Sequence, residues 1–264
     1  MARKQITIVD FLLFIEVLRS AVKIVDSAKL VISESGLEIY GARAKMARCE
    51  LTSNCILSNE RIEFSLENLA MFNKILNTVK DVHENDFSEL KFVYDAPFIR
   101  FESKKLKTKY ASCNENTISK WISKKVETPL EPVFEFTTTS DLIKRVNSHS
   151  FMFSDSKMVR VYVETKDDME TNAVFATLGN KETALNNEIT TKLGLVTSGT
   201  LNPENAKSRK IILDLERLNL FNAVQAPDIK ISLMNLNVLV SKSKILGKNG
   251  SWFSLTIYNT MLKS

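Results

Sequence analysis

The segment LENLAMFNKI at residues 66–75 recurs later in the chain as LERLNLFNAV at residues 215–224. The two copies share the pattern L-E-x-L-x-[ML]-F-N-x-[IV], and the second begins 149 residues after the first. Their apolar residues recur at helical spacing, so each copy predicts a helix with one buried face. Ser65 and Asp214 precede the two copies, and we expect them to be the N-caps of these helices.

Similar elements surround the two copies. We expect a helix at 10–19 and strands at 90–94 and 98–101 in the first half, and a helix at 141–146 and strands at 229–233 and 238–240 in the second. The early helices begin at Asp10 and Asp141, 131 residues apart, so the second half carries an insertion of 18 residues. We expect the polar stretch 197–205 to take part of it as an exposed loop. A repeat of this length predicts a duplicated domain rather than a solenoid unit.

The segment between the two halves predicts a linker. Residues 114–116 are polar, and Pro129 and Pro132 near its end disfavour regular structure. We therefore expect an N-terminal domain at 1–113, a linker at 114–132 and a C-terminal domain at 133–264. The fold class is α+β, with two similar domains that each pack two helices on antiparallel sheets.

The composition is typical of a soluble globular protein. The chain has 264 residues, of which 44% are hydrophobic and 25% charged. No apolar run is long enough to span a bilayer, and residues 1–5 are not followed by an export signal, so we expect the cytosol or the nucleus. The net charge of +5 is compatible with a polyanionic partner but does not demonstrate one.

No catalytic or metal-binding constellation is recognisable in the sequence. Phosphate-cradling glycine loops, H-E-x-x-H and G-x-S-x-G are absent, and the three cysteines include no C-x-x-C pair. His83 is expected in a polar turn and His149 near a helix end, both as surface residues. The acidic cluster at 167–170 could attract a metal ion but is more typical of a hairpin tip. We therefore expect no enzymatic activity, no cofactor and no metal ion.

The order of these elements resembles the DNA sliding clamps of the proliferating cell nuclear antigen and T4-like phage type over nearly the whole chain. Residues 36–40 with 46–51 resemble the first hairpin of the family, 66–76 its second helix and 253–261 its last strand. The basic net charge and the insertion in the second half depart from the family pattern. The resemblance implies a duplicated DNA-clamp fold and a processivity factor that encircles duplex DNA and tethers a DNA polymerase, with a clamp loader as a further partner. The abundance of lysine and asparagine favours a viral or phage source, and hence the host cytoplasm, the nucleus or a viral factory.

In this family four helices of each chain line a positively charged hole, which contacts phosphates without reading the base sequence. The resemblance places seven cations on these helices: Arg19, Lys23, Lys74, Lys80, Lys144, Arg145 and Arg217. For any single helix an ordinary solvated face is the better interpretation. Glu16, Glu67 and Glu216 also dilute the positive pattern.

The resemblance also implies a pocket beneath the linker, where short hydrophobic motifs of polymerases dock. Its expected residues are Ala42, Met46, Ala47, Trp121, Ile122, Val126, Leu130, Pro227 and Tyr258. Trp121 either offers a binding surface or holds the linker against its own domain.

Two strands are expected at the edges of the sheets, where head-to-tail pairing would join chains into a ring. The first contains Thr108, Tyr110 and Ala111, and the second contains Val174, Phe175, Ala176 and Thr177. Two domains in each chain then imply a homotrimer.

Two other functions stay open at this point. A viral polymerase accessory subunit with the same fold could bind DNA without a closed ring, and the basic net charge favours it. A clamp-fold scaffold could instead link transcription to replication without loading on DNA. The sequence names neither the polymerase nor the loader.

Overall fold

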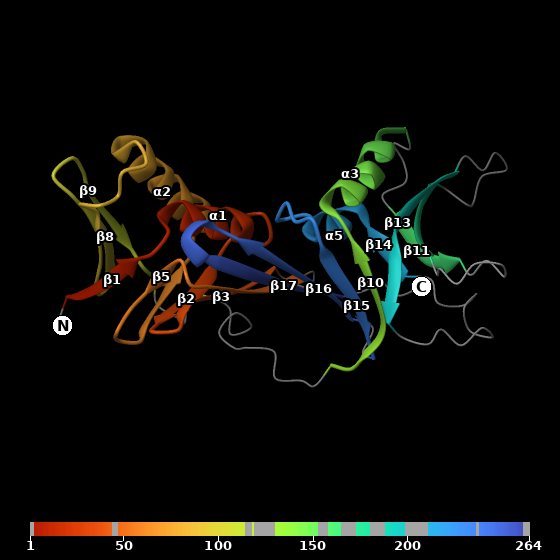
Figure 1. Ribbon diagram of the computed structural model, residues 1–264, viewed down its shortest axis with the longest axis horizontal. Helices are drawn as coiled ribbons and strands as arrows, with labels where there is room; N and C mark the ends of the chain where they lie inside the picture. Colours follow the sequence, from red (N-terminus) through yellow and green to blue (C-terminus); the bar gives the residue numbers. More distant parts are fainter. Residues whose placement is uncertain are drawn as a thin grey trace. The chain divides into compact units, whose positions relative to one another are not determined.

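The computed structural model describes residues 3–43, 47–113, 118, 130–152, 158–164, 173–179, 188–198, 211–235 and 238–260 (Figure 1). Contacts divide the chain into two compact units. The first comprises Met1–Ala44, Arg48–Glu127 and Lys244–Thr256, and the second comprises Lys45–Ala47, Thr128–Ser243 and Ile257–Ser264. Each unit holds helices and antiparallel strands, as the duplication predicts.

The unit division differs from the expected boundaries at three places. Lys45–Ala47 groups with the second unit, the second unit begins at Thr128 rather than at residue 133, and Lys244–Thr256 groups with the first unit. Side chains of the first unit hold this segment. The Trp252 backbone N–H donates to Asn54 Oδ1 at 2.7 Å. The Ser251 hydroxyl donates to Asp10 Oδ2 at 2.7 Å. Position in the sequence alone could not show these contacts, because they join residues 198 and 241 positions apart.

The first unit combines two helices with two groups of antiparallel strands. The helices are α1 (Phe11–Val22) and α2 (Leu69–His83). A five-stranded sheet has the order β5-β1-β7-β8-β9, with β1 Lys4–Ile8, β5 Ile56–Leu57, β7 Lys91–Asp95, β8 Phe98–Glu102 and β9 Lys107–Ala111. A second group has the order β4-β3-β2-β6, with β2 Ala28–Ser33, β3 Gly36–Arg43, β4 Ala47–Ser53 and β6 Ile62–Leu66.

Aromatic residues fill the core between the helices and the five-stranded sheet. Phe92 and Phe101 stack with their ring centroids 4.5 Å apart. Phe14 of α1 lies 5.8 Å from Phe92, and Phe72 of α2 lies 6.2 Å from Phe101. All four side chains are almost completely buried, so they stabilise the unit through apolar burial and edge or offset ring contacts.

The predicted start of the second helix is wrong. Ser65 belongs to β6, which pairs with β2 through Ser65↔Lys29 and Leu66↔Ala28. Asn68 is the N-cap instead, and its side chain accepts a hydrogen bond from the Met71 backbone N–H at 2.8 Å. The helix therefore begins three residues later than the repeat alone predicts.

His83 is also placed differently from the expectation. It lies in the last turn of α2 and is only 3% exposed. Its Nδ1 lies 3.2 Å from the Asp86 carbonyl oxygen and its Nε2 lies 3.0 Å from the Ser103 hydroxyl. Both ring nitrogens thus have partners inside the fold, and the residue connects the end of α2 to the turn after β8.

The second unit repeats this design with shorter helices. Its helices are α3 (Ser140–His149), η2 (Ser150–Met152) and α5 (Leu215–Leu220). The strands follow the order β14-β11-β12-β13-β10-β15-β16, with β10 Pro132–Thr138, β11 Met158–Glu164, β12 Ala173–Gly179, β13 Glu188–Ser198, β14 Ile211–Asp214, β15 Ile229–Met234 and β16 Val238–Leu246. The turn η3 (Lys248–Gly250) and strand β17 (Trp252–Thr260) follow β16.

Asp214 is confirmed as the N-cap of the second repeat helix, because its carboxylate accepts from the Arg217 backbone N–H at 2.7 Å. The helix is only six residues long, whereas α2 has 15. Tighter turns follow it, such as the Ala223 N–H bonding to the Leu220 carbonyl at 3.0 Å. Phe221 and Val224 remain buried nonetheless. The repeat therefore preserves the burial pattern rather than the helix length.

Glu135 on β10 ties three strands together and predicts a pH-dependent stability. Its carboxylate accepts hydrogen bonds from Lys230 at 2.8 Å, from Ser232 at 2.7 Å and from Ser198. Burial alone would raise the pKa of this carboxyl from 4.5, but these hydrogen bonds and the Lys230 charge outweigh burial and lower the pKa to about 2. A pKa below the unfolded value means that the stabilisation is complete above pH 4.5 and is lost as the pH falls through about 2.

We expect Glu135→Gln to lower the free energy of unfolding at pH 6, with the difference from the parent shrinking as the pH falls from 5 towards 2. Urea titrations of both proteins at several pH values would measure it. Glu131→Gln serves as the control, because Glu131 is exposed and lies just before the same strand. A difference for Glu135→Gln that is constant over this pH range would contradict the assignment.

Candidate nucleic-acid interface

The cations expected on α1 lie on its exposed stripe. Arg19 is exposed and forms an ion pair with Glu16 one turn earlier at 3.0 Å. Lys23 is the exposed C-cap residue of the same helix. Ser20 between them is buried, and its hydroxyl donates to the Glu16 carbonyl at 2.8 Å. Because the Glu16 carboxylate forms an ion pair with Arg19, the positive field of α1 is weaker than its number of cations implies.

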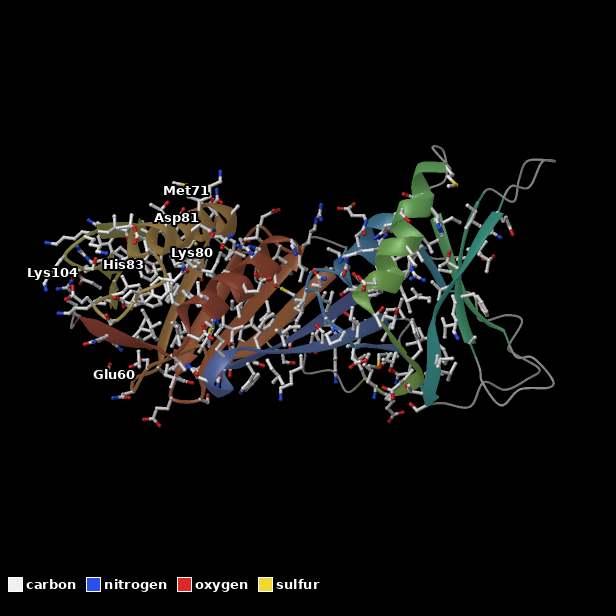
Figure 2. All side chains as sticks on the ribbon, turned by 45° about the horizontal axis from the view of Figure 1, so that its top comes forward. Glu60, Met71, Lys80, Asp81, His83 and Lys104 are labelled. Carbon is white, nitrogen blue, oxygen red and sulfur yellow. The ribbon has the colours of Figure 1, made fainter. Side chains whose placement is uncertain are left out.

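The exposed face of α2 is mixed in character. Lys74 is exposed, whereas Lys80 is half-buried on the flank. Met71 and Asp81 also lie on this helix, with Lys80 beside Asp81 (Figure 2). Met71 is 51% exposed. The helix therefore offers one fully exposed lysine among neutral and acidic side chains.

The helices of the second unit carry the remaining expected cations. Lys144 on α3 is exposed and lies 3.5 Å from Asp141, and Arg145 is exposed beside it. Arg217 on α5 is different, because its side chain is only 12% exposed and its guanidinium pairs with Asp214. Of these three, Lys144 and Arg145 are the ones placed to meet a phosphate.

The residues expected in the partner pocket lie on several elements. Ala42 is half-buried on β3 and Ala47 is buried on β4. Leu130 is half-buried, Pro227 is exposed, and Tyr258 is half-buried on β17. Met46, Trp121, Ile122 and Val126 lie outside the described residues. The pocket therefore stays a prediction.

The first expected edge strand is confirmed as an edge. β9 is the last strand of its sheet and pairs with β8 through Ile99↔Tyr110 and Phe101↔Thr108. The Tyr110 ring lies 5.2 Å from Phe72, and its hydroxyl donates to the Asn68 carbonyl at 3.1 Å. These contacts fix the strand against α2 while its other side stays open among the described residues.

The second expected edge strand is wrong. Val174, Phe175, Ala176 and Thr177 lie on β12, which pairs with β11 on one side and β13 on the other. An interior strand has no unpaired side to offer to another chain. Proline at Phe175 would therefore damage the second unit itself.

The structure instead places an open stretch on β13. Residues 195–198 of β13 pair with β10, whereas residues 188–193 pair only with β12 among the described strands. Exposure alternates along Glu188, Ile189, Thr190, Thr191 and Lys192, which is the pattern of an outer strand. The polar run EITTK was the signal in the sequence that could have identified it.

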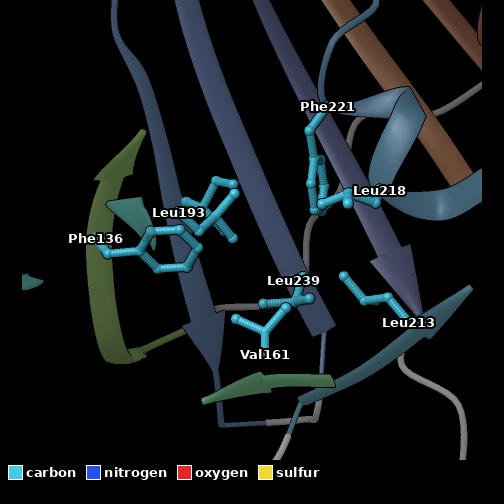
Figure 3. A pocket seen from close by; sticks show the side chains of 8 residues that line it. Phe136, Val161, Leu193, Leu213, Leu218, Phe221 and Leu239 are labelled. Atoms are coloured by element: carbon cyan, nitrogen blue, oxygen red, sulfur yellow. The ribbon is translucent and has the colours of Figure 1, made fainter. Parts of the chain in front are cut away.

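Two hollows are lined by described residues, one of them apolar and the other polar. An apolar cavity of about 10 Å³ lies in the core of the second unit, lined by residues such as Phe136, Val161 and Phe221 (Figure 3). It has room for one water molecule at most, so it is a packing void. An open polar groove of about 410 Å³ lies in the first unit beside Lys4 and Glu60, whose side chains form an ion pair at 2.7 Å.

The thiols and potential metal ligands show no reactive arrangement. Burial raises the pKa of the Cys49 and Cys55 thiols to about 12, so both stay protonated at neutral pH. Cys113 is half-buried, and burial raises its pKa as well. Within the described ranges no three histidine, cysteine or acidic side chains gather as metal ligands. No helix of the described part is long and apolar enough to cross a membrane.

Comparison with known proteins gives matches at the level of structure. No protein-family model matches the chain, and no curated protein matches its sequence. The proliferating cellular nuclear antigen of Entamoeba histolytica superposes with a TM-score of 0.65 at 16% identity, covering 99% of this chain and 98% of that one. The PCNA of A. fulgidus, solved with the C-terminal region of FEN-1 bound, superposes with a TM-score of 0.71 at 12% identity, covering 98% and 99%. The predicted fold class is therefore confirmed: over nearly its whole length this chain has the DNA-clamp fold of these nuclear antigens.

Proposed function

We propose that the protein is a DNA sliding clamp, in which chains join into a ring around duplex DNA and hold a DNA polymerase on its template. The observation that carries the proposal is the match of the whole chain, both units included, to two solved clamp structures. The protein acts without catalysis in this proposal. A clamp loader, a viral or phage source and a cytoplasmic or nuclear location belong to the proposal as well.

Ring closure in this proposal uses the two open strand edges. β9 of one chain pairs with residues 188–193 of β13 in the next, which satisfies the backbone groups on both edges. Because the two edges differ, the contact is head-to-tail and closes when the rotation between chains fits. Two similar units in each chain give a trimer with pseudo-sixfold symmetry.

DNA in the hole would meet the exposed cations of the helices. Arg19, Lys23 and Lys74 come from the first unit, and Lys144 and Arg145 from the second. Contacts of this kind are individually weak and independent of base sequence, so the ring can move along the duplex. In the same proposal, polymerase motifs dock at the pocket that the resemblance predicts around Leu130, Pro227 and Tyr258.

Retention on closed DNA tests the proposed function directly. A ring loaded on a nicked circular duplex should stay bound when salt is raised, and it should be released when a restriction enzyme linearises the circle. Light scattering of the free protein should give the mass of three chains. Equal loss from circular and linear DNA, or a monomeric mass, would contradict the closed ring.

The helix cations are expected to act together. Replacing Arg19, Lys23, Lys74, Lys144 and Arg145 with glutamine should flatten the dependence of duplex binding on salt, because each lost phosphate contact lowers the log–log slope by about 0.9. Arg217→Gln alone should change the slope least, since Asp214 already holds this side chain. The oligomeric mass should not change. An unchanged slope in the multiple variant would show that these helices do not face DNA.

One observation favours the alternative of an accessory subunit that binds DNA without closing a ring. β9 carries exposed Lys107 and Lys109, and lysines on an edge strand discourage pairing with another strand. The mass measurement separates the two functions. Three chains support the ring, and a monomer that still binds DNA supports the open form.

A further inference from the structure

One face of the five-stranded sheet in the first unit has no helix of the described residues packed on it. Phe92 and Phe101 point towards the helices, where Phe14 and Phe72 contact them. Side chains alternate between the two faces of a strand, so their neighbours point to the opposite face. A contact confirms this placement, because Lys109 Nζ of β9 lies 3.6 Å from the centre of the Phe98 ring of β8.

This opposite face is strongly basic. Five cations lie on it, against the two carboxylates Asp95 and Glu102: Arg3, Lys91, Arg100, Lys107 and Lys109. We call Lys91, Arg100, Lys107 and Lys109 the outer-sheet patch. The positive charge in this part of the chain is therefore not confined to the helices, where Arg19, Lys23, Lys74 and Lys80 are accompanied by Glu16 and Asp81.

The register arranges the patch in rows across the strands. Lys91 lies opposite Glu102, which lies opposite Lys107. In the next row Val93 lies opposite Arg100, which lies opposite Lys109. Since neighbouring strands are about 4.8 Å apart, the two lysines of the first row are separated by roughly 10 Å at the backbone. Flexible lysine side chains can span the spacing between successive phosphates from such positions.

The lysines of the patch are available for a ligand. Lys91 and Lys107 are exposed and form no ion pair within the described part of the chain. Lys109 contacts only the neutral Phe98 ring among the contacts measured there. Arg100 and Arg3 instead form ion pairs with carboxylates. Arg100 pairs with Asp95 at 3.0 Å, and Arg3 pairs with Glu102. The three lysines thus carry most of the positive charge on this face that no neighbouring carboxylate neutralises.

The chemistry of this face fits a phosphate backbone better than a protein partner. Protein interfaces depend on a few buried apolar or aromatic anchors. The large exposed hydrophobic side chains of the described residues are Val9, Leu12, Met71, Met152, Leu195 and Leu246, and none lies on β7, β8 or β9. Phe98 on this face is half-buried beneath Lys109. Exposed lysines attract a polyanion through point charges and read no sequence.

We propose that the outer-sheet patch is a second nucleic-acid site, which binds the phosphodiester backbone on the sheet face opposite α1 and α2. All its residues belong to one unit of one chain, so a single chain already carries the complete site. A strand of nucleic acid outside the hole, either single-stranded or duplex, would be its ligand.

Binding of short oligonucleotides tests the site. Fluorescence anisotropy would follow a 12-nucleotide single strand and a 12-base-pair duplex between 50 and 200 mM salt. In Lys91→Gln/Lys107→Gln/Lys109→Gln the log–log salt slope should fall by about 2 for the single strand or by about 3 for the duplex. The oligonucleotide whose salt slope falls more is the preferred ligand, and a lower slope for either oligonucleotide supports the site.

Two further variants separate the patch from other effects. Lys91→Gln/Arg100→Gln leaves β9 unchanged, so a loss of slope there cannot come from altered pairing of that edge. Lys244→Gln/Lys248→Gln removes the same net charge as Lys91→Gln/Arg100→Gln, but from the β16–β17 hairpin, and it should leave the slope nearly unchanged. Equal losses in the patch variants and this control would overturn the proposal as a general charge effect.

The remaining outcomes also decide the matter. Unchanged oligonucleotide binding in both patch variants would overturn the proposal. The lysines would then be solvent-exposed side chains that discourage pairing of β9 with another strand. If the patch variants lost only binding of a polyglutamate peptide, the surface would take an acidic protein segment instead. Retention on circular DNA is a separate measurement, so failure of the ring and failure of this site are distinguishable.

Discussion

Replacing Ala111 with proline is expected to separate the proposed ring of three chains into folded monomers. Ala111 is the exposed last residue of β9, the edge strand of the five-stranded sheet. Proline has no backbone N–H. It therefore cannot donate a hydrogen bond to a strand on the side towards which the Ala111 N–H points. Because a ring needs every one of its contacts, loss of this edge should change the measured mass by a factor of about three.

The hydrogen bonds at the two ends of the hairpin show which side Ala111 faces. The Ser103 N–H donates to the Leu106 carbonyl at 2.8 Å, and the Ser112 N–H donates to the Pro97 carbonyl at 2.7 Å. In an antiparallel pair the bonded residues alternate, so Thr108 and Tyr110 point their backbone groups to β8. Lys107, Lys109 and Ala111 point theirs to the open edge. Proline at Ala111 therefore spares the pairing within the chain.

Neighbouring substitutions provide matched controls. Tyr110→Pro removes a donor to β8, and it should lower the thermal stability of the first unit as well as the mass. Ala111→Ser keeps the N–H and should keep the trimer. Light scattering gives the mass, and circular dichroism shows whether each variant is folded. A trimeric Ala111→Pro protein at low concentration would show that β9 is not a subunit edge.

Local patterns predicted the elements well because local physics determines them. Helical spacing identified α1 and α2, and the capping preference of Asp214 marked the start of α5 correctly. The alternation at 90–94 and 98–101 corresponds to β7 and β8 within a residue at each end. In each case the signal and the structure lie in the same short segment.

Long-range pairing explains the expectations that failed. Ser65 and Asn68 are both good N-cap residues, and only the pairing of β6 with β2 excludes Ser65. His83 precedes polar residues in sequence, but Ser103 packs back onto its ring. The edge assignment failed for the same reason, because β12 has neighbours on both sides and β13 supplies the open stretch.

The sequence predicts which residue types the candidate site contains, but not which of its cations form ion pairs. The sequence shows that α1, α2, α3 and α5 carry cations. It does not show that Asp214 holds Arg217 or that Glu16 shares Arg19. It also concealed the basic sheet face, because Lys91, Arg100 and Lys109 lie on three different strands and only the pairing register places them on one face.

Phe72→Ala is expected to have the largest effect on stability of any substitution in the repeat helices. The side chain is fully buried, and its ring lies 6.2 Å from Phe101 and 5.2 Å from Tyr110. Truncating a buried phenylalanine removes apolar contacts and leaves a cavity, which lowers the free energy of unfolding by about 3–5 kcal/mol. Met71→Ala at the neighbouring position is the matched control, because Met71 is 51% exposed and should change stability by about 0.5 kcal/mol or less.

The position of Phe72 also connects stability to assembly. Its ring supports Tyr110, which anchors β9, so Phe72→Ala should loosen the open edge before the unit unfolds. Amide hydrogen exchange should therefore accelerate at residues 107–111 in this variant more than in β1, which β7 and β8 separate from that edge. Urea titration measures the global loss, and exchange at the two strands measures its distribution. A loss below about 1 kcal/mol, or equal acceleration in both strands, would show that Phe72 neither anchors the core nor supports the edge.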